Sequence, residues 1–129
     1  MTAHAIAVRL ATQRDAQAIA LMSRDLIEAG LGWKYDAPRV LKSIRDPDTL
    51  TPLASDRGRI AGFAVMEFGD ERAHLVLLAV RPTHRRAGVG RRLVEWLVES
   101  ERAAGIASLH LELRAGNEAA RGFYRAMGF

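Results

Sequence analysis

The sequence predicts a mixed α/β domain with a central sheet flanked by helices. Two observations support this fold class. Strand-like and helix-like hydrophobic patterns alternate along the chain, and the apolar run at residues 75–80 leads through a glycine-containing loop into a helical pattern. A length of 129 residues fits one domain covering residues 1–129. With 49% hydrophobic and 26% charged residues, the composition is typical of a soluble globular protein.

The first half predicts a strand, two helices and a weak strand. Residues 4–10 alternate and are rich in Ile and Val, which favours a strand. A helix then begins at Thr12, with Asp15 in a capping position, and ends at Gly30 and Gly32. Its buried face comprises Ala16, Ile19, Ala20, Ser23, Leu26, Ile27 and Gly30.

A second, shorter helix begins at Asp36 or Ala37, has Pro38 in its first turn and stops at residues 46–48. Residues 50–55 follow as a weak strand, and Pro52 within it predicts a sheet edge.

The second half predicts the centre of the sheet. A turn at residues 56–59 precedes a strand at 60–68, and a hairpin turn at 69–70 leads to the central strand at 72–81. The nearly continuous apolar run in that strand implies cover on both faces. The remaining predicted elements are a helix at 88–104, a strand at 106–114 and a last helix at 118–127.

The loop after the central strand has the pattern of an anion site. Gly88 and Gly90 allow tight turns and close approach of a ligand to the backbone, and the first N–H groups of a helix attract phosphate. Nearby arginines add full charges. Two common phosphate motifs are excluded, because the chain lacks a Gly-Lys-Ser/Thr triplet and because Leu93 stands where a dinucleotide fingerprint needs its third glycine.

The pattern Arg85-x-x-Gly88-x-Gly90, directly after Val80-x-Pro82, resembles the acetyl-CoA pyrophosphate loop of the GCN5-related N-acetyltransferases, the GNAT superfamily. The stretch from Leu111 to Asn117, followed by Tyr124-x-x-x-Gly128-Phe129, is similar to the family's second motif. The two motifs occur in the family's order. The resemblance covers roughly residues 60–129 and is closest to bacterial protein N-terminal acetyltransferases that modify a ribosomal protein alanine.

This resemblance implies a mostly antiparallel GNAT sheet, acetyl-CoA as acetyl donor, and a role for each matching residue. Glu112 would be the general base, Tyr124 would be the general acid near the cofactor sulfur, and Asn117 would contact the cofactor. Strand backbone groups would hold the pantetheine arm at Leu78, Ala79 and Val80. The pyrophosphate would be held by Arg85, Arg86, Ala87, Gly88, Val89, Gly90 and Arg91.

Several alternatives stay open at this point. His74 and His110 are alternative bases, because a histidine titrates near neutral pH. Trp33 and Tyr35 either line a pocket for the amine substrate or cover the core at a helix end. Asn117 could act chiefly as a helix cap. We expect no metal site, because the chain has no Cys and no close His pair with helical ligand spacing.

Function is predicted accordingly: an acetyl-CoA-dependent N-acetyltransferase that moves an acetyl group directly to a primary amine, either a protein N-terminus or a small molecule. One alternative is a non-catalytic acyl-CoA sensor. The other is a nucleic-acid-binding domain, which the net charge of +4 and the arginines would suit. The low aromatic content of 6% argues against nucleic-acid binding. The family continues past Gly-Phe with two further strands. We therefore expect a longer native protein or a homodimer that covers the exposed strand edge.

Location is predicted from what the sequence lacks. The chain has no Cys, no apolar run long enough to cross a bilayer and no secretory signal pattern. We therefore expect a cytoplasmic protein without membrane contact.

Overall fold

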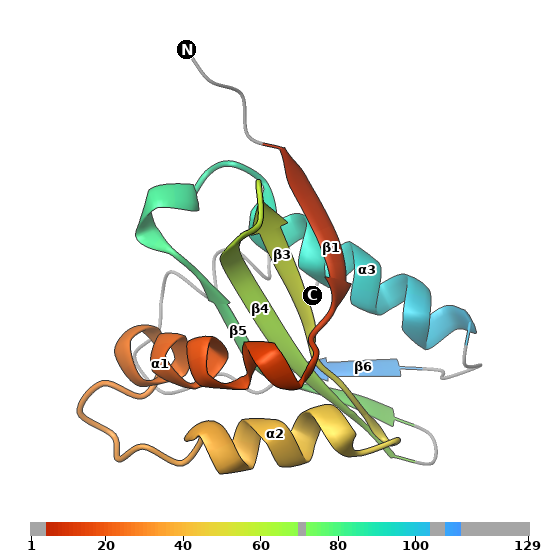
Figure 1. Ribbon diagram of the computed structural model, residues 1–129. Coiled ribbons are helices and arrows are strands. Elements are labelled where there is room, and N and C mark those ends of the chain that lie inside the picture. The colour runs from red at the N-terminus through yellow and green to blue at the C-terminus, as the bar shows by residue number, and fades with distance from the viewer. Residues whose placement is uncertain (1–4, 70–71, 104–107, 112–129) are drawn as a thin grey trace.

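The computed structural model describes residues 5–69, 72–103 and 108–111, where a six-stranded sheet carries helices on both faces (Figure 1). The α-helices are α1 (Ala16–Leu26), α2 (Ala37–Arg45) and α3 (Val89–Ala103), and the 3-10 turns η1 (Gln13–Asp15) and η2 (Pro82–His84) precede α1 and α3. The strands are β1 (Ile6–Leu10), β2 (Thr49–Leu50), β3 (Pro52–Asp56), β4 (Arg59–Phe68), β5 (Arg72–Val80) and β6 (Ser108–Leu111). The predicted last helix, at 118–127, lies outside the described residues.

The sheet is mixed and mostly antiparallel, which confirms the predicted fold class. Its strand order is β1-β3-β4-β5-β6, and β2 pairs with β4. Among the described strands, β5 and β6 form the parallel pair. Parallel neighbours need a crossover connection, and α3 lies between these two strands in the chain. The chain therefore leaves the sheet at the end of β5, enters α3 and returns as β6.

Two helical layers cover the sheet, as the apolar run in β5 predicts. On one face, Ile19 of α1 and Val40 of α2 pack with Phe63 and Leu77. On the other face, Leu97 of α3 packs among side chains from β4 and β5, including Ala64, Met66, Ala73 and Leu75. The position of β4 and β5 between the two helical layers is thus stabilised by apolar side chains buried on both faces of these strands.

A β-bulge at Val76 changes the faces of β5. In the pairing with β4, Val65 lies opposite Leu77 and Met66 lies opposite Leu75, so Val76 is the extra residue. Val76 and Leu77 consequently pack on the side of α1 and α2, whereas Leu75 packs on the side of α3. The described part of β6 pairs with β5 only before this bulge, at residues 72–75.

The prediction of a sheet edge at Pro52 is wrong. Pro52 is the first residue of β3, and β3 lies between β1 and β4. A proline at the start of a strand is tolerated within a sheet because no ladder hydrogen bond from its missing N–H is required there. Among the described strands, the edge strand on this side of the sheet is β1.

The predicted first helix is too long at both ends. Its first turn is the 3-10 turn η1, where the Asp15 carboxylate accepts hydrogen bonds from the Thr12 N–H (2.7 Å) and hydroxyl (3.2 Å). The helix ends at Leu26, because the Ser23 carbonyl accepts from the N–H groups of both Ile27 (3.0 Å) and Glu28 (2.8 Å). Gly30, predicted to be on the buried face, is exposed.

The second helix confirms the prediction. The Asp36 carboxylate caps α2 by accepting a hydrogen bond from the Arg39 N–H at 3.1 Å, and Pro38 lies in the first turn. The turn at 56–59 is also confirmed. Arg57 and Gly58 both have positive φ, of 54° and 85°, as a tight hairpin between twisted strands requires.

Candidate functional site

The end of β5 is fastened to β4 immediately before the loop. The Arg81 N–H donates to the Ala61 carbonyl at 2.8 Å, and the Arg81 Nε donates to the Ile60 carbonyl at 2.7 Å. η2 follows, and its His84 N–H donates to the Arg81 carbonyl at 2.9 Å. These bonds set the direction in which the chain leaves the sheet.

The loop from η2 to α3 leaves several backbone N–H groups without an acceptor among the described residues. Arg86 and Gly88 have positive φ, of 64° and 78°, a conformation that is uncommon for a residue other than glycine. The Arg92 N–H makes a hydrogen bond of 3.0 Å to the Gly88 carbonyl. No described residue accepts from the N–H groups of residues 89–91. This first turn of α3 therefore has the unpaired donors and the positive dipole end of an anion site.

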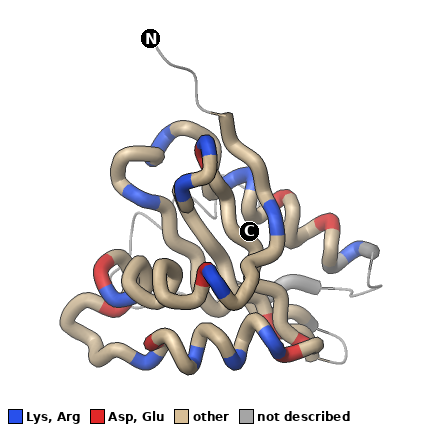
Figure 2. Tube along the Cα trace, viewed as in Figure 1, with Lys and Arg blue, Asp and Glu red and all other residues tan. Residues whose placement is uncertain are grey.

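Arginines surround these N–H groups. Figure 2 shows basic residues along the loop and at the start of α3. One of them also has a structural role, because the Arg92 Nη1 donates to the Ile6 carbonyl and ties α3 to β1. The combination of helix dipole and guanidinium charge favours a ligand with several negative charges, such as a pyrophosphate. The exposed members of the group are Arg85, Arg86, Arg91 and Arg92.

Gly62 allows α3 to lie close to the sheet at this point. A Cβ at Gly62 would meet the Ala79 carbonyl oxygen at 2.7 Å, the Val89 Cγ1 at 3.1 Å and the Leu93 Cδ1 at 3.4 Å. Val89 and Leu93 are buried against the sheet. The start of α3 is therefore placed by a close contact that only glycine permits.

A side-chain bridge connects the loop to the β3–β4 hairpin. The Nε2 of His84 lies 2.9 Å from the Oδ2 of Asp56, and the side chains are only 15% and 14% exposed. The other ring nitrogen of His84, Nδ1, lies 2.9 Å from the Thr83 hydroxyl. Asp56 also accepts a hydrogen bond from the Ala5 N–H through Oδ1, at 3.0 Å.

The strand residues predicted to hold a pantetheine arm lie at the end of β5. Leu78, Ala79 and Val80 pair with Ala64, Phe63 and Gly62 of β4. On the opposite edge of β5, the described residues of β6 pair only with residues 72–75. The structure therefore brings the predicted strand residues next to the loop, on a stretch whose second edge has no partner strand among the described residues.

The alternative base His74 lies in the middle of the sheet. Its Cα partners are Glu67 on β4 and His110 on β6, so both candidate histidines lie side by side. The neighbours of His74 in sequence, Ala73 and Leu75, pack on the α3 side, which puts His74 on the face covered by α1 and α2.

The two aromatic residues predicted for the amine pocket have different environments. Tyr35 is 8% exposed and belongs to the core beside α1 and α2, and its burial raises the pKa of its phenol. Trp33 is 41% exposed. The Trp33 ring is held by its Nε1, which donates to the carbonyls of Ala20 (3.2 Å) and Tyr35 (3.0 Å). Tyr35 thus fits the alternative in which it covers the core, whereas Trp33 remains partly accessible at the surface.

The predicted catalytic residues Glu112 and Tyr124, and the cofactor residue Asn117, lie outside the described residues. Within the part of the chain that the structure describes, no group of three or more His, Asp or Glu residues gathers as a metal site would require.

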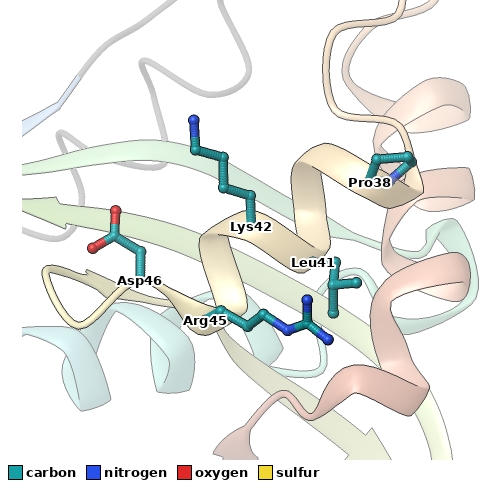
Figure 3. Close-up of a pocket in the computed structure, with 5 residues that line it drawn as sticks. All are labelled: Pro38, Leu41, Lys42, Arg45 and Asp46. Atoms are coloured by element: carbon teal, nitrogen blue, oxygen red, sulfur yellow. The ribbon is translucent and has the colours of Figure 1, made fainter.

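A shallow hollow of about 450 Å³ lies along α2, far from the loop in Figure 1. Pro38 and Leu41 provide its apolar wall, and Lys42, Arg45 and Asp46 provide its charged rim (Figure 3). No residue predicted for a site lines it.

The fold and this loop define a mixed α/β domain with a strand–loop–helix whose donors and charges suit an anion. Residues 10–129 match the family model described as the Acetyltransferase (GNAT) family. The chain therefore belongs to the GNAT acetyltransferase family, as its two motifs predict. No helix in the described part has the length and apolar character that crossing a membrane requires.

Individual relatives differ in what they acetylate. The chain is 39% identical over 75 residues to the [ribosomal protein bS18]-alanine N-acetyltransferase of Escherichia coli K12, a match covering 58% of this chain and 51% of the relative. It is 34% identical over 86 residues to the streptothricin acetyltransferase of Streptomyces lavendulae, covering 65% of this chain and 45% of the relative. The chain thus spans about half the length of these curated relatives.

A solved structure shares the fold over nearly the whole chain. The PaiA N-acetyltransferase of Thermoplasma acidophilum, in complex with coenzyme A, superimposes with a TM-score of 0.86 at 18% identity. The match covers 95% of this chain and 88% of that one.

Sequence reasoning missed Gly62, Asp56 and the bridging role of His84. The signals for Gly62 and Asp56 were weak. A single glycine within a strand pattern suggests a close backbone approach, and an Asp before a turn is ordinarily explained by the turn itself. His84 stands within the quoted loop, but its partner is 28 residues away in sequence.

Proposed function

We propose that this chain binds acetyl-CoA and transfers its acetyl group directly to a primary amine. The observation that carries the proposal is the loop at residues 85–91, where unpaired N–H groups of α3, two positive-φ positions and exposed arginines converge. Coenzyme A has a pyrophosphate that suits such a site. The coenzyme A complex of the Thermoplasma neighbour, which shares this fold, supports the choice of ligand.

The pantetheine arm and thioester are proposed to extend from the loop along the end of β5. Leu78, Ala79 and Val80 are adjacent to the loop and have a strand edge with no described partner strand. Backbone N–H groups on such an edge can donate to an amide of the arm or to the oxyanion that forms on the thioester carbonyl.

The acceptor amine must lose a proton before it attacks the thioester carbonyl. We propose Glu112 as the group that takes this proton, with His74 and His110, which are paired across β5 and β6, as the alternatives. Collapse of the tetrahedral intermediate breaks the carbon–sulfur bond, and Tyr124 is proposed to protonate the leaving thiolate. Direct transfer requires no enzyme nucleophile, which suits a chain without Cys.

The acceptor class is a primary amine, on a protein N-terminus or a small molecule. Support for a protein N-terminus comes from the relative named for a ribosomal protein alanine, and support for a small amine comes from the relative named for streptothricin. Trp33, with 41% of its surface exposed at the α1–α2 connection, is the proposed contact for this substrate.

The test is calorimetric titration of the chain with acetyl-CoA, beside the double variant Arg86→Glu, Gly88→Asp. A matched control is Lys42→Glu, Gly30→Asp, which makes the same charge changes. Gly30 has a φ of 76° and, like Gly88, open space around its Cβ position. We expect the parent and the control to bind and the loop variant to lose at least tenfold in affinity, since one guanidinium is removed and two carboxylates are introduced beside the proposed phosphate site.

Binding by the parent would then justify screening small amines and peptide N-termini for acetylated product by mass spectrometry. No binding by a folded parent would contradict the proposed cofactor. Binding without transfer to any amine would favour the acyl-CoA sensor instead.

A further inference from the structure

The bridge between Asp56 and His84 connects three separate segments of the chain. His84 is the last residue of η2 and directly precedes the loop, and Asp56 ends β3. Through its two carboxylate oxygens Asp56 contacts His84 at 2.9 Å and the N–H of Ala5, before β1, at 3.0 Å. The loop is therefore braced against the sheet by a residue outside the loop motif.

The protonation of the His84 ring follows from its partners. A carboxylate only accepts hydrogen bonds, so the Nε2 facing Asp56 carries a proton. Nδ1 can accept from the Thr83 hydroxyl or donate to it, so the ring is satisfied on both sides. The pair is about 15% exposed, which keeps this charge-assisted bond from being screened as a surface contact would be.

His84 also shapes the loop through its backbone. Its carbonyl accepts a hydrogen bond from the Ala87 N–H at 3.3 Å, across the Arg86 position with positive φ. Movement of His84 would therefore shift the strained turn at Arg86 and, through Gly88, the first turn of α3. Those are the groups proposed to hold the pyrophosphate.

We infer that Asp56 and His84 are positioning residues for the cofactor, and that their bridge sets the affinity of the loop for acetyl-CoA. This inference rests on the proposed function. The Arg9–Asp15 pair offers an internal comparison: it has the same 2.9 Å separation but ties β1 to η1 and α1, away from the loop. If the Asp56–His84 bond only stabilised the fold, its removal would leave acetyl-CoA affinity unchanged, as we expect for the Arg9–Asp15 pair.

The experiment is a double-mutant cycle with Asp56→Ala, His84→Ala and the double variant, and with Asp15→Asn as control. The acetyl-CoA dissociation constant is measured by calorimetry, and urea denaturation gives the stability of each variant. We expect each single variant to weaken acetyl-CoA binding about tenfold, the double variant to lose no more than either single one, and the control to bind like the parent.

A conservative variant keeps the test decisive if an alanine variant does not fold. Asp56→Asn retains an oxygen acceptor, and we expect it to restore most of the affinity lost in Asp56→Ala. If an amine acceptor is found, the KM for acetyl-CoA should rise in the bridge variants while kcat and the KM for the amine stay within twofold. A general loss of stability would not produce that separation.

The outcomes separate the two proposals. If the parent binds acetyl-CoA and the folded single variants bind it equally well, the inference is overturned and the proposed function stands. If the losses of acetyl-CoA affinity in the two single variants multiply in the double variant, Asp56 and His84 act independently, and the inference is overturned as well. If the folded parent binds no acetyl-CoA, the proposed function fails, and this inference fails with it.

Discussion

The β5–α3 loop and the α1–α2 connection use their polar groups in opposite ways. In the loop, the N–H groups of residues 89–91 have no acceptor among the described residues, and the arginines around them are exposed. In the connection, by contrast, polar side chains make hydrogen bonds within the protein. Glu28 is 3% exposed and accepts hydrogen bonds from the Ser23 hydroxyl (2.7 Å) and the Lys34 N–H (2.8 Å).

The aromatic residues of the connection likewise have partners within the protein. The Trp33 Nε1 is satisfied by two backbone carbonyls, and the guanidinium of Arg24 lies 5.6 Å from the Trp33 ring centroid. Arg39 lies over the Tyr35 ring at 5.1 Å and 3.8 Å from Glu67. Arginines here stack on rings and pair with carboxylates, whereas Arg85, Arg86 and Arg91 at the loop are exposed.

The two regions are therefore suited to different roles. Unpaired donors and free charge indicate a region completed by an anionic ligand. The connection, whose buried carboxylate and indole N–H already have partners, exposes apolar surface instead, at Trp33 and at Leu31, which is 55% exposed. Changes in the connection should therefore affect stability before cofactor affinity, and changes around the loop should affect both.

The largest expected effect is that of Glu28→Ala. The Tyr35 N–H lies 3.2 Å from Oε2 of Glu28, so truncation leaves this donor, the Lys34 N–H and the Ser23 hydroxyl without their acceptor. We expect a loss of about 3 kcal/mol in the free energy of unfolding, measured by urea denaturation, because buried unsatisfied groups each cost about 1–3 kcal/mol.

Glu28→Gln is the matched control, because its amide oxygen keeps an acceptor of the same size in place. It should lose about 1 kcal/mol. Both variants, where folded, should bind acetyl-CoA like the parent. A cost below about 0.5 kcal/mol for the alanine variant would show that Glu28 does not organise the connection, while weaker acetyl-CoA binding would show that the two regions are coupled.

Gly62→Ala should have an intermediate effect on stability and a clear effect on the loop. The new Cβ would lie 2.7 Å from the Ala79 carbonyl oxygen, which is backbone and cannot rotate away. We expect a loss of about 2 kcal/mol, typical of overpacking, together with weaker acetyl-CoA binding because the start of α3 moves.

Gly88→Ala provides the contrast for Gly62→Ala. It meets nothing within 4 Å, so its cost is the conformational strain at a φ of 78°, about 1 kcal/mol. If the two alanine variants had equal urea midpoints, the close contact at Gly62 would not matter for the placement of α3.

The parts of the fold that could be predicted from the sequence are those whose signals are local. The β5–loop–α3 unit was predictable because its signals are local: an apolar run, two glycines and an amphipathic pattern that follow one another. The Asp36 cap of α2 and the turn at 56–59 are local in the same sense. The family and fold class followed from such units and their order, and the comparisons confirm both.

What failed depends on contacts between distant segments. Pro52 is an edge signal by itself, yet β1 pairs with β3 from more than 40 residues away and makes it an inner strand. The buried carboxylate of Glu28, just after α1, has partners at residues 34–35 that no helix signal contains. The Val76 bulge and the Asp56–His84 bridge likewise require the register of β4. Roles for Glu112, Asn117 and Tyr124 stay predictions.

The smallest expected effect concerns the Arg9–Asp15 pair. Hydrogen bonding to Arg9 lowers the pKa of Asp15 from its ordinary value of 3.8, further helped by Thr12 and opposed by burial. Because the folded-state pKa is the lower one, the ionised carboxylate contributes stability above about pH 4, and this contribution is lost as the pH falls through the folded-state pKa. Arg9 is half exposed, so the contribution should stay below about 1 kcal/mol.

Asp15→Asn tests this sign directly. The variant should be slightly less stable than the parent at pH 6, and the difference should shrink as urea denaturation is repeated from pH 5 down to pH 3. Acetyl-CoA binding at pH 7 should not change, since the pair ties β1 to η1 and α1 and makes no contact with the loop. A stability difference that grows on acidification would contradict the lowered pKa. A loss of cofactor affinity would mean that strain in this part of the sheet reaches the loop through β1, to which Arg92 of α3 is bonded at Ile6.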